Sequence, residues 1–166
     1  MKTEKYQRKI NDVISKCPIE AGVEILVYNL LDECVDEEIF SVVDINRICK
    51  GKDSRLTTEA GIPDIAVVSK DFRFAETALG NVYGLVEVKA AGVSVRVTDQ
   101  SSGEAKKAKH FIYTNGLVWK FYEDGDNKAV FNLIEGKKKP HSKSPIVLDQ
   151  VEFKNLQDYL LNIKWK

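Results

Sequence analysis

The chain has 166 residues, of which 43% are hydrophobic and 30% are charged. This length and composition predict a single domain over residues 1–166 with a hydrophobic core of its own. The 25 basic residues balance the 25 acidic ones, and a net charge of zero at first sight disfavours a nucleic-acid partner.

The charges are nevertheless distributed unevenly along the chain. Acidic residues outnumber basic ones in residues 1–48, and the reverse holds in residues 86–143. Two explanations stay open: a basic second half that faces phosphates, and an ordinary solvated charged surface.

Two further features of the composition indicate a cytoplasmic protein without a membrane partner. No apolar run is long enough to span a bilayer, and the polar, charged start of the chain is unlike a signal peptide. The cysteines are odd in number and widely spaced, which argues against disulfides and against a zinc site. They are Cys17, Cys34 and Cys49.

Two helices are predicted at the start of the chain, over residues 4–15 and 18–35. Pro18 is suited to the first position of the second helix. At about 100° per residue, that helix presents one apolar stripe, which consists of Ile19, Val23, Leu26, Val27, Leu30 and Leu31.

One acid of this second helix lies on its apolar stripe. Glu20 falls inside the stripe in projection, and Glu24 lies about 40° further round, at its edge. An acid that faces a core needs a partner, and a metal site would supply one. Alternatively, Glu20 only complements the helix dipole in the first turn. We favour Glu20 as the functional acid of this helix and keep Glu24 in reserve.

Three strands are predicted next, over residues 39–48, 62–70 and 83–90. Asp64 lies at the mouth of the second strand. Alternation along the third strand puts Glu87 and Lys89 on one face. Charged side chains are rarely buried unless they are paired or bind metal. The pattern therefore indicates either a metal site or a cross-strand ion pair on a half-solvated strand.

The remaining elements complete a mixed sheet with flanking helices, an α/β fold. Residues 93–97 extend the third strand, and a short helix covers residues 99–109. A hairpin over 110–114 and 117–122 turns at Asn115-Gly116, a strong hairpin signal, and a further strand covers 129–134. Asp149 caps the last helix, and Glu152 three residues on completes a capping box. The apolar face of this helix consists of Val151, Leu156, Tyr159, Leu160 and Ile163.

The two charged strands carry a known signature. Pro63-Asp64, followed by Glu87-Val88-Lys89, resembles the motif of the PD-(D/E)xK nuclease superfamily, which has a restriction-endonuclease-like fold. The fold implied by this resemblance is the same α/β arrangement, a central mixed sheet flanked by helices.

A second stretch adds to the resemblance. Residues 114–122, which read Thr-Asn-Gly-x-x-Trp-x-Phe-Tyr, are similar to a stretch in the nuclease domain of type I restriction enzymes. The resemblance covers roughly residues 18–135. Some branches of the superfamily carry a glutamine on the helix after the catalytic strand, and Gln100 matches that position. A surface polar residue is an equally good interpretation of Gln100.

The resemblance implies a set of roles around a cation. Asp64 and Glu87 would bind Mg²⁺, or Mn²⁺ in its place, with the Val88 carbonyl as a further ligand. Lys89 would orient or activate the attacking water, or stabilise charge on the phosphate. The acid that the superfamily adds from a preceding helix would be Glu20. Mg²⁺ does prefer hard oxygen ligands, and one or two carboxylates usually hold it together with waters and substrate phosphate.

The predicted function is a metal-dependent DNA endonuclease whose specificity comes from a partner, from a homodimer or from DNA structure. The alternative is a nuclease fold that has lost its chemistry and acts as a DNA- or protein-binding module of phage or mobile-element origin. Without a cation, two neighbouring acids repel and the pKa of one rises. We therefore expect Lys89 to pair with one of the carboxylates when no cation is bound.

Overall fold

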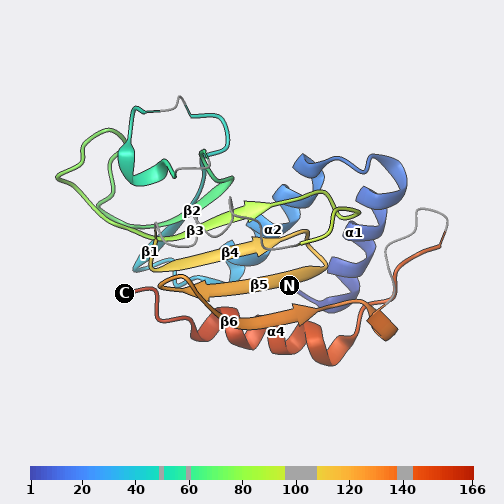
Figure 1. Cartoon of the computed structure of the whole chain (residues 1–166). Helices are drawn as coiled ribbons and strands as arrows, with labels where there is room; N and C mark the ends of the chain where they lie inside the picture. The colour runs from blue at the N-terminus through green and yellow to red at the C-terminus, as the bar shows by residue number, and fades with distance from the viewer. Residues whose placement is uncertain (49–50, 59–60, 96–107, 138–143) are drawn as a thin grey trace.

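The computed structural model describes residues 1–48, 51–58, 61–95, 108–137 and 144–166. Their order along the chain is shown in Figure 1. The helices are α1 (Thr3–Lys16), α2 (Glu20–Cys34) and α4 (Gln150–Asn162), with two short 3-10 helices, η1 (Ser54–Leu56) and η2 (Glu135–Lys137). The strands are β1 (Phe40–Asp44), β2 (Ile65–Ser69), β3 (Val82–Val88), β4 (His110–Thr114), β5 (Val118–Glu123) and β6 (Asp126–Asn132).

The six strands form one mixed sheet in the order β1-β2-β3-β4-β5-β6. The pairs are antiparallel except for β3 and β4, which run parallel. Sequential strands are thus neighbours throughout, and the one parallel pair requires the longer connection that separates β3 from β4. The predicted α/β fold, a mixed sheet with flanking helices, is confirmed.

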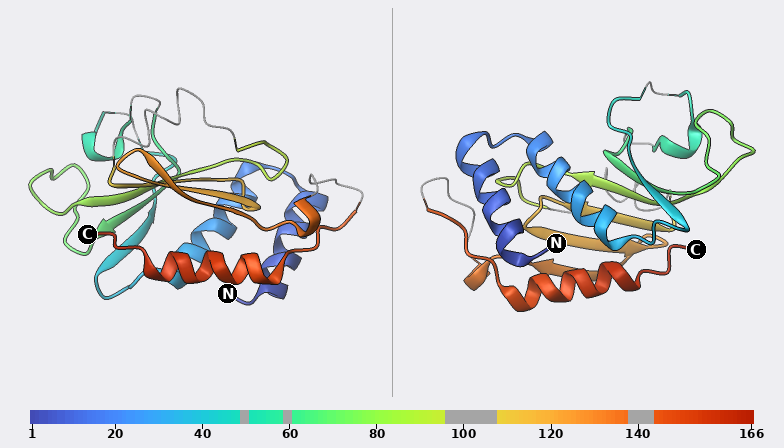
Figure 2. Two further views of the ribbon diagram at one scale, coloured as in Figure 1. Left: turned by 60° about the horizontal axis from the view of Figure 1, so that its bottom comes forward. Right: turned by 180° about the vertical axis from the view of Figure 1, so that it is seen from behind.

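The helices α1, α2 and α4 cover one face of the sheet, as both views in Figure 2 show. Their apolar stripes pack with the side chains that the strands direct to this face, and together they form the main core. Its fully buried members include Tyr6, Ile10, Val27, Leu30, Val86, Trp119 and Phe153.

A smaller apolar cluster lies on the opposite face of the sheet. The strands contribute Ala66, Val68, Leu85, Phe111, Tyr113 and Tyr122 to it. The segment between β1 and β2 contributes Ile45 and Leu56, which cover these side chains. Because successive strand residues face opposite sides, this second cluster identifies which strand side chains point away from the helices.

Two predicted boundaries before β2 are wrong by a few residues, each for a local reason. Helix α2 begins at Glu20, because Ile19 has an extended backbone and acts as its N-cap. Ile19 is exposed and does not belong to the apolar stripe. Strand β1 ends at Asp44, whose carboxylate accepts a hydrogen bond of 3.0 Å from the backbone N–H of Asn46. Such a local side-chain turn competes with strand pairing.

The predicted extension of β3 is also wrong in the part that the structure describes. The chain turns after β3, where the backbone N–H of Val93 donates to the carbonyl of Ala90 at 2.8 Å. The predicted helix over residues 99–109 falls almost entirely outside the described residues, and Gln100 with it.

The hairpins at β5 differ from the prediction in their turns. The β4–β5 loop has three residues, with Gly116 at a φ of +79°, which matches the three-residue hairpin with glycine in the left-handed region. Strand β6 begins at Asp126 because Asp124 and Gly125 both have positive φ, 51° and 85°. Asp-Gly in a two-residue loop is itself a hairpin signal, and the sequence interpretation missed it.

The last helix keeps only part of its predicted cap and face. The Asp149 carboxylate accepts hydrogen bonds from the N–H groups of Val151 and Glu152. The Asp149 N–H donates to the Leu133 carbonyl at 2.9 Å, so it is not available for the return bond of a capping box. Val151 is exposed, whereas Phe153 is buried. Residues two positions apart on a helix are separated by about 200° of rotation, so these two side chains point to nearly opposite sides of α4.

No helix in the described ranges is both long and apolar enough to cross a membrane. Cys17 is an exposed free thiol and Cys34 a buried one.

Candidate active site

Asp64, Glu87 and Lys89 come together where β2 begins and β3 ends. The antiparallel register pairs Ile65 with Val86. One step beyond this pair, Asp64 and Glu87 therefore lie side by side at the same end of the sheet. Both are buried, with 6% and 9% of their surface exposed.

Asp64 joins three neighbouring segments through its backbone and its side chain. Its carbonyl accepts a hydrogen bond of 2.9 Å from the N–H of Ile45, and its own N–H donates to the carbonyl of Val86 at 3.0 Å. Its carboxylate atom Oδ2 accepts a bond of 2.6 Å from the N–H of Val88. The Asp64 carboxylate thus takes the place of a main-chain carbonyl as the acceptor for the Val88 N–H. Strand β2 begins only at Ile65 and offers no carbonyl there.

This arrangement also orients the carbonyl of Val88. The N–H and C=O of one strand residue point to the same side of the strand. Because the Val88 N–H points to the Asp64 carboxylate, its carbonyl faces the same gap at the start of β2. Two carboxylates and a main-chain carbonyl are hard oxygen ligands of the kind that Mg²⁺ takes, so the donor set fits this cation.

Lys89 supplies the positively charged side chain of the site. Its Nζ donates to Glu87 Oε1, and it lies 4.0 Å from Glu20 Oε2. The Lys89 and Glu20 side chains are 28% and 42% exposed, so the site is open on the side of the α2 N-terminus. The pairing of Lys89 with a carboxylate agrees with the expectation from the sequence.

Burial dominates the electrostatics of the two buried acids. It raises the pKa of Asp64 to about 7, against the lowering effect of the Val88 hydrogen bond, and the charges of Glu87 and Glu24 raise it further. Burial also raises the pKa of Glu87, although the hydrogen bond from Lys89 opposes it. Burial is the largest single effect on Lys89 and lowers its pKa, but the pKa still lies above its ordinary value because the hydrogen bond to Glu87 and the charges of Glu87, Glu20 and Asp64 together outweigh burial. An added cation would lower the cost of holding both acids charged.

The two acids of α2 have different partners. Glu20 approaches Lys89, as described above. Glu24 Oε2 accepts a bond of 2.9 Å from the Asn46 side chain. Burial raises the pKa of Glu24, and the nearby charges of Asp44 and Glu20 add to this. Within the described residues, however, no three histidine, cysteine or acidic side chains gather closely enough to hold a metal ion by themselves.

Comparisons with known proteins agree with the fold and give no family. No protein-family model matches the chain, and no curated protein matches it. Among solved structures, a chain of the cryo-EM structure of a DrdV–DNA complex is similar, with a TM-score of 0.61 and 12% sequence identity. The similarity covers 96% of this chain and 95% of that chain. At this identity it is the fold that is shared, and the restriction-endonuclease-like fold class expected from the sequence is confirmed.

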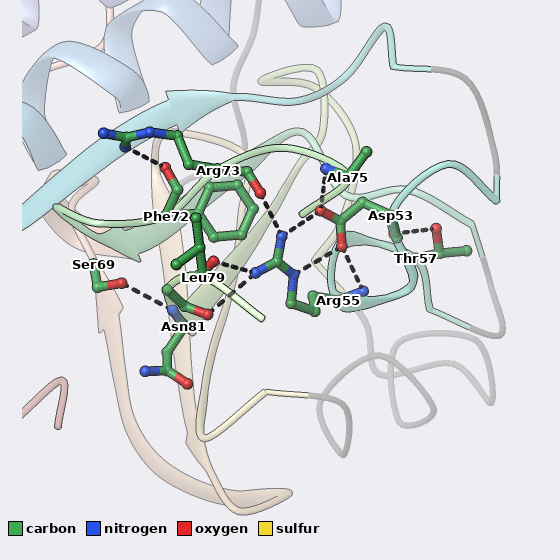
Figure 3. A network of polar contacts seen from close by, with 10 residues as sticks. Asp53, Arg55, Thr57, Ser69, Phe72, Arg73, Ala75, Leu79 and Asn81 are labelled. Atoms are coloured by element: carbon green, nitrogen blue, oxygen red, sulfur yellow. Dashed lines mark hydrogen bonds and ion pairs between the residues drawn. The ribbon is translucent and has the colours of Figure 1, made fainter. Parts of the chain in front are cut away.

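A partly buried ion pair in the segment before β2 was not found by sequence reasoning. Arg55 contacts both carboxylate oxygens of Asp53 through Nε and Nη2, at 2.9 Å and 2.6 Å. Its other donors reach the carbonyls of Leu79, Gly80 and Arg73 (Figure 3). The pair therefore fastens the segment before β2 to the β2–β3 connection. Its only local signal is the Asp-x-Arg spacing, whereas the carbonyl partners are distant in sequence.

Asn115 is a second residue whose role was missed. Its Nδ2 donates to the carbonyls of Ala91 and Val93, at 3.3 Å and 2.7 Å. Its Oδ1 accepts from the N–H groups of Leu117 and Val118. Asn115 was predicted only as a turn residue, yet it also anchors the segment that directly follows Lys89.

Proposed function

We propose that this protein is a metal-dependent DNA endonuclease of the PD-(D/E)xK superfamily that hydrolyses phosphodiester bonds in the cytoplasm. The observation that carries the proposal is the convergence of Asp64, Glu87 and Lys89 at one end of β2 and β3. Burying two acids next to a lysine destabilises a fold. A role in binding a cation that also contacts phosphate would explain why these residues are buried together.

In this proposal, Asp64, Glu87 and the Val88 carbonyl hold Mg²⁺, or Mn²⁺ in its place. When bound, the cation would polarise the phosphoryl oxygen and lower the pKa of its water. Asp64 keeps one carboxylate oxygen for this purpose, since the other accepts the Val88 hydrogen bond. Glu20 is the proposed additional acid, because it approaches the site from α2.

Lys89 has the remaining chemical role. With the cation on Glu87, its ammonium is released to orient the attacking water or to stabilise charge on the phosphate. Gln100 is proposed to face the same site, in line with the superfamily pattern.

DNA is the proposed substrate because a structural neighbour that matches almost the whole chain is part of a DNA complex. The basic excess of residues 86–143 agrees with this. Specificity would come from a partner protein or from a homodimer, in which each protomer cuts one strand.

The test is to incubate the purified protein with plasmid, linear duplex, single-stranded and branched DNA, each in Mg²⁺, in Mn²⁺ and in EDTA. The proposal expects cleavage of at least one DNA form in either metal and none in EDTA. Intact DNA in every metal condition would contradict it.

One observation favours the second candidate, an inactive nuclease fold that binds DNA or protein. No ready-made metal-binding group of three acidic, histidine or cysteine side chains occurs in the described residues. Calorimetric titration separates the two candidates. The enzyme should bind Mg²⁺ or Mn²⁺ and lose this binding in Asp64→Asn, whereas the binding module should take up neither cation.

A further inference from the structure

The sheet continues the row that begins with Glu87. On β4 its register partner is Tyr113, and on β5 the partner of Tyr113 is Lys120. Register partners on adjacent strands point to the same face of a sheet. Glu87, Tyr113 and Lys120 therefore form one row across three neighbouring strands.

The neighbours of Lys120 along β5 show which face this is. Trp119 and Phe121 belong to the core under the helices. Tyr122 belongs to the cluster on the other face, and Val118 packs against that cluster. Lys120 lies between Trp119 and Phe121 in the strand, so its side chain points to the opposite face from theirs. That is the face of Val118 and Tyr122, away from the helices.

Lys120 lies where this face opens to solvent. It is half-buried, and its partner on β6, Val130, is 53% exposed. In the described part of the chain, the Lys120 ammonium has no carboxylate partner. A lysine that is held on a sheet by apolar neighbours, and that pairs with no carboxylate among the residues described, can offer its charge to a ligand.

Two strand spacings separate Lys120 from Glu87, about 10 Å at the usual distance between strands. Each step of a DNA strand advances about 3.4 Å along the helix axis and also winds around that axis, so about 10 Å between two phosphates corresponds to about one or two steps. A backbone whose scissile phosphate lies at Glu87 would thus bring a neighbouring phosphate over Lys120.

We propose that Lys120 binds a backbone phosphate one or two nucleotides from the bond that is cut. The inference rests on the proposed nuclease function and names a substrate-binding residue for it. The acids around the site, among them Glu20, Glu24 and Asp44, repel DNA. A cation fixed on the same sheet face offsets this repulsion, and lysine is a common phosphate ligand that acts as a point charge.

The test measures DNA binding separately from cleavage. A fluorescent duplex is titrated with wild type, Lys120→Gln and Lys120→Arg in EDTA over a range of salt concentrations. Lys154→Gln is the matched control, because Lys154 is an exposed lysine of α4 on the opposite side of the sheet. Cleavage in Mg²⁺ is measured on the same duplex at limiting and at saturating concentrations of the DNA.

Lys120→Gln should weaken binding about five- to tenfold and reduce the salt slope by about one unit. Lys120→Arg should restore most of the affinity, and Lys154→Gln should leave it unchanged. Cleavage should show a raised KM with kcat unchanged, as expected for a contact made equally in ground and transition states.

Two results overturn the inference. One is a salt slope and KM for Lys120→Gln equal to those of wild type while wild type cuts DNA, which leaves the nuclease proposal intact. The other is an equal loss in Lys154→Gln. If wild type binds DNA through Lys120 but cuts none, the binding inference holds and the nuclease proposal fails.

Discussion

The carboxylate of Asp64 accepts a 2.6 Å hydrogen bond from the backbone N–H of Val88. This bond fixes the acid against the last residue of the neighbouring strand. Burial raises the pKa of Asp64, and the charge of Glu87 raises it further. The same residue therefore stabilises the end of the sheet by its hydrogen bond and destabilises it by its charge.

The first prediction concerns the pH dependence of stability. The pKa of Asp64 is about 7 in the folded protein and about 4 in an unfolded chain. Between these values the folded state holds a proton that the unfolded state has released. The free energy of unfolding should therefore fall as the pH rises from about 4 to about 7 and then level off.

Asp64→Asn should remove this dependence while keeping an acceptor for the Val88 N–H. At pH 8 and without divalent cations, we expect the variant to be more stable than wild type, by on the order of 1–3 kcal/mol. Urea unfolding at pH 5 and at pH 8 measures the effect, with Asp71→Asn, at an exposed site, as the control. Equal stability of Asp64→Asn and wild type at pH 8 would show that the buried charge of Asp64 does not destabilise the fold.

The second prediction separates metal binding from catalysis at Lys89. The Lys89 ammonium occupies Glu87 Oε1 and competes there with a cation. Lys89→Ala should therefore bind Mg²⁺ at least as tightly as wild type, about two- to tenfold more tightly by Coulomb's law at an intermediate dielectric, and yet cut no DNA. Calorimetric titration measures the affinity. Glu87→Gln should abolish binding, and a Lys89→Ala variant that loses Mg²⁺ would refute the competition.

The third prediction concerns the Asp53–Arg55 pair. The hydrogen bonds from Arg55 lower the pKa of Asp53 to about 2, against the raising effect of burial. The stability from this acid is therefore complete above its unfolded pKa of about 4 and is lost as the pH falls towards about 2. Asp53→Asn should cost about 1–3 kcal/mol at pH 7, because Arg55 is left partly buried without its counter-ion.

The cost of Asp53→Asn should shrink as the pH approaches 3, and this convergence is what a denaturation series from pH 3 to pH 7 would detect. Asp126→Asn, at an exposed ion pair with Lys128, should change stability by less than about 1 kcal/mol at any pH. A cost for Asp53→Asn that does not vary with pH would point to lost packing in place of lost charge.

The fourth prediction tests the β4–β5 turn. Gly116 has a φ of +79°, and a Cβ at this position would lie 2.8 Å from Val23 Cγ1. Gly116→Ala should therefore cost about 1–3 kcal/mol through strain and displacement of the core. Gly92→Ala is the matched control, because a Cβ there meets nothing within 4 Å and no left-handed backbone is required. Similar melting temperatures for the two variants would contradict this account of the turn.

The elements that the sequence predicted best are those with strong local periodicity. The apolar repeat of α2 and the alternation that puts Glu87 beside Lys89 each depend on residues a few positions apart, and both are visible in one chain. The same reasoning failed at Val151, where the choice of face depends on how α4 packs on the sheet. It also missed Asp124-Gly125, although its hairpin signal is local.

The features that sequence could not supply are contacts between distant segments. Arg55 binds carbonyls 18 to 25 residues away, and no pattern along the chain encodes a main-chain acceptor. The Val88 N–H bonds to the Asp64 carboxylate because β2 begins only at Ile65, two residues after the position that would lie opposite Val88 in this register. Glu20 and Glu24 were left as alternatives, and their separate partners, Lys89 and Asn46, depend on the position of α2 over the sheet.

The most direct test of the account is single-turnover cleavage in Mg²⁺ by wild type, Asp64→Asn, Glu87→Gln and Lys89→Ala, with the exposed-site variants Asp71→Asn and Lys70→Ala as matched controls. Circular dichroism first establishes that every variant is folded. The account predicts cleavage by wild type and both controls, stopped by EDTA, and a loss of at least about 10²-fold in each of the three site variants. Wild-type rates in any folded site variant, or cleavage that persists in EDTA, would contradict the central claim that these three residues and a divalent cation cut DNA.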